Sequence, residues 1–82
     1  MTVKEFKSLQ ETEQIRILYE DGVFVGKRKQ EKTKVLLYQV EGFYVEVFYS
    51  SYRRHISHMQ CTQSTNVLEP YLEQIDVEYL VG

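Results

Sequence analysis

Two histidines and the only cysteine of this 82-residue chain recur at intervals of three, at His55, His58 and Cys61. These residue types are common zinc ligands, and a cysteine beside a histidine is also a typical nucleophile–base pair. Zinc needs three or four converging ligands, and a fourth candidate is missing from this segment. If the segment is a strand, alternation places His58 opposite His55 and Cys61. We therefore expect no metal, cofactor or catalytic residue here; a small enzyme using this segment is the third alternative.

Positive charge and aromatic rings are concentrated in the middle of the chain. Residues 22–60 carry seven basic and three acidic groups, whereas residues 1–21 and 61–82 have net charges of −2 and −4. Aromatic side chains on a sheet, flanked by lysine and arginine, bind single-stranded RNA by stacking on bases and contacting phosphates. The candidate binding residues are Lys27, Arg28, Lys29, Lys32, Tyr44, Phe48, Tyr52, Arg53, Arg54 and His55.

The same features also have a structural explanation that needs no ligand. Charged residues are usual at exposed hairpin tips, and lysines on strands discourage edge pairing. Aromatic and β-branched residues are good strand formers. The whole chain is slightly acidic, with a net charge of −2. We therefore expect a non-enzymatic binding or adaptor domain with a protein partner, and nucleic-acid binding is the alternative function.

The N-terminal third is predicted to form two helices, at 3–8 and 9–20. The segments Thr2–Glu5 and Ser8–Glu11 both match a capping box, in which a hydroxyl and a carboxylate each accept a backbone N–H. Gly22 is expected to end the second helix, because glycine tolerates the left-handed conformation common just past a helix. Apolar residues recur at helical spacing, and they are Val3, Phe6, Leu9, Ile15, Leu18 and Tyr19.

The middle of the chain is predicted to form an antiparallel sheet with strands at about 23–29, 34–40 and 43–52. Two-residue turns at Gln30-Glu31 and Glu41-Gly42 give registers that agree on one apolar face. This first face is predicted to pack on the N-terminal helices and to hold Val23, Val25, Leu36, Tyr38, Val40, Phe43, Val45 and Val47. The second face is predicted to hold Phe24, Val35, Leu37, Gln39, Tyr44, Glu46 and Phe48.

After the third strand, residues 53–62 are predicted to form a fourth strand or an irregular bend. A helix is predicted to start near Asn66, with Pro70 in its first turn, where proline is tolerated. Its apolar stripe is Leu68, Tyr71, Leu72 and Ile75. The order α-α-β-β-β-(β)-α predicts a single α+β domain over residues 1–82, a two-layer sandwich with an antiparallel sheet of three or four strands.

The second face is too apolar to be left entirely in water, so the C-terminal segment or a second copy of the chain is expected to cover it. If the C-terminal stripe packs on the first face instead, the second face predicts a homodimer through Phe24, Val35, Leu37, Tyr44 and Phe48. No apolar run approaches the roughly 20 residues of a membrane helix, so no membrane partner is expected. A single cysteine fits a reducing compartment, and we expect a cytoplasmic protein.

Overall fold

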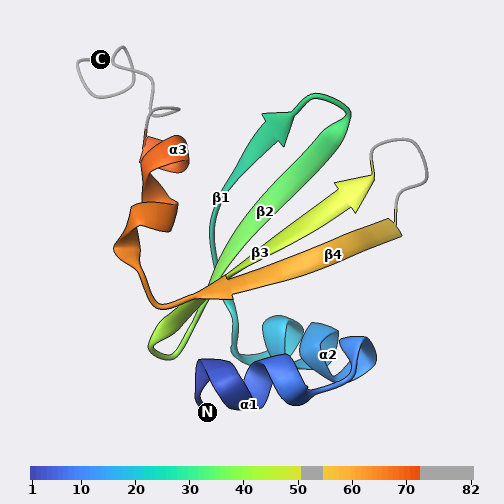
Figure 1. The fold of residues 1–82 in the computed structure, drawn as a ribbon, viewed down its shortest axis with the longest axis vertical. Coiled ribbons are helices and arrows are strands. Elements are labelled where there is room, and N and C mark those ends of the chain that lie inside the picture. The colour runs from blue at the N-terminus through green and yellow to red at the C-terminus, as the bar shows by residue number, and fades with distance from the viewer. Residues whose placement is uncertain (51–54, 73–82) are drawn as a thin grey trace.

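The computed structural model describes residues 1–50 and 55–72, which form an α+β fold (Figure 1). Helices α1 (Val3–Ser8) and α2 (Glu11–Asp21) precede the strands β1 (Val23–Gln30), β2 (Thr33–Val40), β3 (Phe43–Ser50) and β4 (His55–Thr62). A 3₁₀ turn, η1 (Thr65–Leu68), leads into the short helix α3 (Glu69–Leu72). The predicted fold class is confirmed, with four strands in the sheet. None of the described helices is long and apolar enough to cross a membrane.

The sheet is antiparallel throughout and has the strand order β1-β2-β3-β4, so β1 and β4 are its edges. The predicted two-residue turn between β2 and β3 is present, and Val40 pairs with Phe43 across it. Tyr38 pairs with Val45, as the turn requires. Glu41, the first residue of the turn, has a φ of 50° and takes the left-handed conformation. The register of this hairpin is therefore confirmed.

The prediction for β1 is wrong in register and in face. The first hairpin turns one residue later than predicted, since Gln30 pairs with Thr33. A β-bulge between Phe24 and Gly26 adds a further shift, and Phe24 therefore pairs with Tyr38. One inserted residue exchanges the two faces of a strand. Phe24 consequently lies on the first face, whereas Val23 and Val25, predicted to be core, are 64% and 40% exposed.

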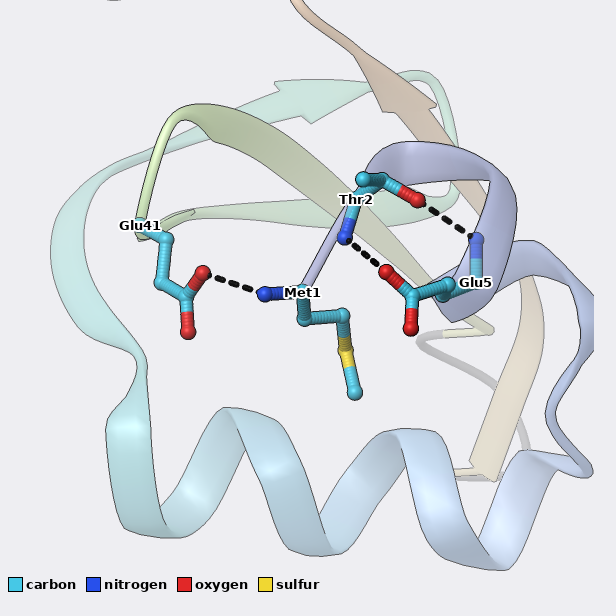
Figure 2. A network of polar contacts seen from close by, with 4 residues as sticks. All are labelled: Met1, Thr2, Glu5 and Glu41. Carbon is cyan, nitrogen blue, oxygen red and sulfur yellow. Dashed lines mark hydrogen bonds and ion pairs between the residues drawn. The ribbon is translucent and has the colours of Figure 1, made fainter.

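Helix α1 begins at the predicted capping box, which Figure 2 shows. The Thr2 hydroxyl accepts a hydrogen bond from the Glu5 N–H at 3.1 Å, and the Glu5 carboxylate accepts one from the Thr2 N–H at 3.0 Å. The amino group of Met1 donates to Glu41 at 2.6 Å and joins this end of the helix to the β2–β3 turn. The second predicted box is wrong, because the Ser8 hydroxyl donates to the Glu5 carbonyl oxygen instead.

Helix α2 ends at Gly22 as predicted, although for a different reason. Gly22 has a φ of −77°, which any residue adopts. A Cβ atom at this position would lie 2.4 Å from the Leu18 carbonyl oxygen. Such a contact is far inside van der Waals distance, so the glycine permits a close approach of the chain to the last turn of the helix.

Helices α1 and α2 cover the end of the first face that lies near the β2–β3 turn, and the strands extend beyond them (Figure 1). The core there is fully closed: Phe6 of α1 is 0% exposed, and its ring centroid lies 5.5 Å from that of Phe43. Ile17 and Leu18 are the buried residues of α2, whereas Ile15 and Tyr19, predicted to share the core stripe, are exposed. From β4, Ile56, Met59 and Cys61 pack against the same core.

The C-terminal segment lies on the second face. Ser64, rather than the predicted Asn66, caps η1, and Pro70 occupies the first turn of α3 as predicted. The Tyr71 ring packs on Gly26 of β1 and is 7% exposed. Leu72 is 58% exposed, and the predicted stripe residue Ile75 lies outside the described residues.

Candidate functional site

An apolar groove lies on the first face where α2 ends and the strands continue. Its volume is about 320 Å³. Tyr19 of α2 is 90% exposed, and Phe24 of β1 is 54% exposed, at its rim. The Phe24 and Tyr38 rings pack edge to face, with centroids 5.7 Å apart. We call this feature the open groove and define it by six lining residues: Ile15, Tyr19, Phe24, Tyr38, Tyr49 and Ile56.

Lysines border the open groove at the far end of the strands. Lys27 pairs with Leu36, and Lys29 pairs with Lys34, so all three lysines share the first face with Phe24 and Tyr38. All three are exposed. Among residues 1–50 and 55–72, no carboxylate forms an ion pair with them. This lysine end is therefore a positive border that keeps its charge available to a ligand.

The last turn of α2 is acidic but does not line the open groove. Glu20 and Asp21 follow Tyr19 directly in sequence, and Glu20 lies beside Arg16, outside the groove lining. Arg16 lies 3.7 Å from Glu20 and 2.7 Å from Glu13, but all three side chains are about half exposed. Exposed ion pairs of this kind contribute little stability. The charge that borders the open groove along the strands is therefore that of the lysine end.

The second face holds a closed cluster around one buried carboxylate. Glu46 of β3 is 8% exposed and accepts hydrogen bonds from the Tyr71 hydroxyl at 2.8 Å and from Arg28 at 3.1 Å. The Arg28 guanidinium also lies 5.9 Å from the centroid of the Phe48 ring and 5.8 Å from that of Tyr71. His58 stacks on the other side of Phe48 at a centroid distance of 4.2 Å. We call these five residues the second-face cluster.

One tyrosine on each face has a raised pKa. Burial, and then the hydrogen bond to Glu46, raises the pKa of Tyr71 to about 12. Burial raises the pKa of Tyr49 in the open groove, and the charge of Tyr38 adds to this effect. Because the Tyr71 phenol stays protonated, it remains a hydrogen-bond donor to the Glu46 carboxylate over the physiological range. The second-face cluster therefore has a structural role, in which it attaches α3 to the sheet.

The structure does not bring the predicted binding residues together. Arg28 and Phe48 meet in the second-face cluster, where Arg28 is engaged by Glu46 and Phe48 is 7% exposed. Lys27 and Lys29 lie on the other face. The remaining predicted residues are dispersed: Lys32 is in the first hairpin turn, Tyr44 is half-buried at the start of β3, and His55 is exposed at the start of β4. Tyr52, Arg53 and Arg54 lie outside the described residues.

The histidine and cysteine positions do not converge. A bulge in β4 pairs Phe48 with His58 and Ser50 with His55, so both histidines share the second face, contrary to the predicted alternation. Cys61 pairs with Val45 on the first face. Burial raises the pKa of the Cys61 thiol, which disfavours the reactive thiolate, although nearby Lys7 acts in the opposite direction. In the described part of the chain, no three His, Cys, Asp or Glu side chains are placed to hold a metal ion.

Comparison with known proteins identifies no relative: no protein-family model, curated protein or solved structure matches this chain. The geometry of the two faces is therefore what indicates a function for this chain.

The sequence of α2 contains a signal for the open groove in the width of its apolar stripe. At 100° per residue, the large apolar side chains of α2 cover an arc of about 200° around the helix. These side chains are Ile15, Ile17, Leu18 and Tyr19. A helix that packs on one surface needs an apolar stripe only somewhat wider than about 100°. The excess width indicates a second apolar contact for this helix. No sequence pattern predicts the contact between Tyr71 and Glu46. The two residues are distant in sequence, and Glu46 has the pattern of an ordinary exposed strand residue.

Proposed function

We propose that this chain is a small, non-enzymatic protein-binding domain and that the open groove is its binding surface. One observation carries the proposal: Tyr19 and Phe24 are 90% and 54% exposed at the rim of an apolar groove of about 320 Å³. Monomeric proteins rarely expose contiguous apolar patches larger than a few hundred Å², and larger patches often mark an interaction site. Tyrosine and phenylalanine are also enriched in the buried centres of protein interfaces.

The borders of the open groove define the chemistry of the partner. Lys27 and Lys29, which share the face of the groove, favour an acidic group. Complementary charges at the rim of an interface contribute mainly specificity and association rate. The partner therefore presents an apolar surface with an acidic border. The single Cys61, which is half-buried and free, supports the further proposal of a cytoplasmic location.

Peptide selection tests the open groove without a known partner. A random peptide library displayed on phage is selected against the wild-type chain, and binders are measured on Phe24→Asp and on the control Leu72→Asp. Leu72 is a matched control because it is 58% exposed and belongs to α3, away from the groove. We expect selected peptides to lose about tenfold or more in affinity for Phe24→Asp and to keep their affinity for Leu72→Asp.

Both variants should keep the wild-type melting temperature, because substitutions at exposed positions usually change stability by no more than about 0.5 kcal/mol. Binders that recognise Phe24→Asp and the wild type equally would show that the open groove is not the preferred binding surface.

Single-stranded nucleic acid is the second candidate ligand, and one observation favours it. Lys27, Lys29 and Lys34 share a face with the half-buried rings of Tyr38 and Tyr49. Rings beside lysines can stack on bases and contact phosphates. Fluorescence anisotropy with labelled oligouridine and oligothymidine tests this candidate. Each lysine replaced by glutamine should reduce the slope of log affinity against log salt by about 0.7. Absence of binding to both oligonucleotides at low salt would rule out single-stranded nucleic acid as a ligand.

A further inference from the structure

We infer that the open groove binds a short acidic peptide segment, in which carboxylates lie next to an apolar side chain. This inference rests on the proposed function, since it names the class of partner that occupies the same surface. The lysine end carries it: Lys27, Lys29 and Lys34 are exposed on the first face. The carboxylates of the peptide contact these lysines, and its apolar side chain enters the groove.

A row of cross-strand neighbours joins the lysines to the open groove. Lys29 of β1 pairs with Lys34 of β2, which in turn pairs with Tyr49 of β3. Tyr49 pairs with Ile56 of β4, and both of these residues line the groove. Directly opposite residues on one face of a sheet have Cβ atoms roughly 5 Å apart. A side chain bound in the groove therefore lies next to Lys34, and the neighbouring residues of the same peptide reach Lys29.

The lysines are arranged at a cost to the isolated fold. Like charges directly opposite each other on a sheet are destabilising, and Lys29 and Lys34 form such a pair. Lys27 lies on the same face of the same strand as Lys29 and adds to the repulsion. Over residues 1–50 and 55–72, no carboxylate forms an ion pair with any of the three. Local arrangements that oppose stability are expected where a protein meets its ligand.

Protection of the sheet edge does not account for this arrangement. Lysines on an edge strand discourage pairing with another chain, and Lys27 and Lys29 on the edge strand β1 suit that role. Lys34, however, belongs to β2, which is paired on both sides. A ligand anion beside the groove explains the position of Lys34, which edge protection leaves unexplained.

The lining of the open groove favours a peptide over nucleic acid. Bases stack on aromatic rings, whereas Ile15, Leu18 and Ile56 give the groove an aliphatic lining that suits an apolar side chain. The net charge of the chain is −2, and nucleic-acid-binding domains are typically basic. Ligand pockets commonly measure about 300–1,000 Å³. The groove, at about 320 Å³, therefore suits a few side chains of a short segment.

The second face offers no comparable surface, and the predicted dimer through it is not available to the folded chain. Val35 and Leu37, which were expected to be its centre, are both 0% exposed within one molecule. Phe48 is covered by His58, and Phe24 lies on the other face. Among the described residues, the second face therefore lacks an exposed apolar centre.

The peptides selected from the phage library test the inference directly. Those that lose affinity for Phe24→Asp should be enriched in Asp and Glu next to an apolar residue. The most enriched peptide is then synthesised with its own carboxylates and with the corresponding amides. In fluorescence anisotropy at low salt, the acidic form should bind the wild type about tenfold more tightly, and added salt should reduce this preference.

Lys34→Gln should weaken binding of the acidic form about fivefold, as expected for the loss of one exposed charge pair. Lys4→Gln is the matched control, because Lys4 is an exposed lysine on α1 and its replacement changes the net charge equally. We expect Lys4→Gln to bind the acidic form as the wild type does.

Lys29→Glu separates a binding role from a structural one. The change replaces repulsion from Lys34 by attraction, so the melting temperature at low salt should rise by about 2–4 °C. The same variant should bind the acidic peptide about tenfold more weakly than the wild type. A variant that gains stability and keeps its affinity would overturn the inference.

The remaining outcomes distinguish this inference from the proposed function. Peptides that depend on Phe24 but show no acidic enrichment would overturn the inference and leave the open groove as a binding surface. If no selected peptide depends on Phe24, both fail. Oligouridine that binds the wild type more tightly than the acidic peptide, and loses affinity for Lys34→Gln, would overturn the inference in favour of nucleic acid.

Discussion

The two faces of one sheet are completed in different ways. On the first face, two helices close a fully apolar core near the β2–β3 turn and leave the far end as the open groove. On the second face, a helix of four residues reaches the sheet through one tyrosine, which bonds a buried carboxylate. The first face is tightly packed where the two helices cover it and is open elsewhere. The second face is closed by α3, which is held through a few polar contacts of Tyr71 and Glu46.

Element length explains this difference. Strands of eight residues are about 27 Å long, and an 11-residue helix is about 16 Å long. Helix α2 therefore cannot shield the whole length of the strands. The second face needs less cover because Gly26 has no side chain, and a single Tyr71 ring can lie directly on the strand. The proposed binding surface and the anchoring contact of Tyr71 therefore lie on opposite faces of the sheet.

Placing a charge in the closed part of the first face should produce the largest effect. Val45 is 0% exposed, so Val45→Asp buries a carboxylate without a partner and should reduce the free energy of unfolding by roughly 3–5 kcal/mol. Urea denaturation measures the loss. Val25→Asp is the control: Val25 is 40% exposed in the bulge, and we expect a change within about 0.5 kcal/mol. Equal losses at the two positions would contradict the assignment of open and closed regions.

The anchoring role of the second face predicts an alkaline transition. Tyr71 has a pKa of about 12 in the folded chain and an ordinary value of 10.0 when unfolded. Its raised pKa stabilises the fold fully below pH 10, and this contribution is lost as pH rises toward 12. Tyr71→Phe removes this dependence and, at neutral pH, should cost about 1 kcal/mol through the lost hydrogen bond.

The measurement is the free energy of unfolding of the wild type and of Tyr71→Phe as a function of pH. The difference between them should be constant up to about pH 10 and then shrink, since Tyr71 alone distinguishes the two proteins. A difference that stays constant up to pH 12 would show that the Tyr71 phenol is not held in its protonated form by the fold.

The contact between Tyr71 and Gly26 should give the smallest effect. A Cβ atom at Gly26 would lie 3.3 Å from the Tyr71 ring. Gly26→Ala should therefore cost about 0.5 kcal/mol in the wild type, but stabilise by a similar amount when residue 71 is alanine, because alanine lowers the entropy of the unfolded chain. A double-mutant cycle measures this coupling. Identical effects in both backgrounds would place Tyr71 away from β1.

The sequence predicted the parts of the fold that local rules control. The two-residue turn at Glu41-Gly42 and alternating apolar residues were enough to give the register of β2 and β3, because each constrains the other. The capping box at Thr2 was sufficient to begin α1 at Val3. In both cases, the partners are close in sequence.

The remaining features depend on contacts that local patterns do not contain. The bulge in β1 cannot be predicted from the run Val23-Phe24-Val25, because each of these three apolar residues suits either face of the sheet. The ligand residues were predicted from charge and aromatic content alone, so Arg28 and Lys29 were grouped although adjacent strand residues point to opposite faces. The open groove itself arises because α2 is shorter than the strands, which is a property of the assembled fold.

The bulge in β1 also affects how well this edge strand can serve as a template for fibril growth. An edge strand that exposes Val23, Phe24 and Val25 has the composition of an aggregation-prone segment. Growth of a cross-β fibril requires a regular, uninterrupted backbone ladder, and the irregularity between Phe24 and Gly26 interrupts it within this segment. The charged residues Lys27, Arg28 and Lys29 follow directly and oppose stacking of identical strands. The chain can thus keep apolar side chains exposed on β1 while its backbone edge remains a poor template for polymerisation.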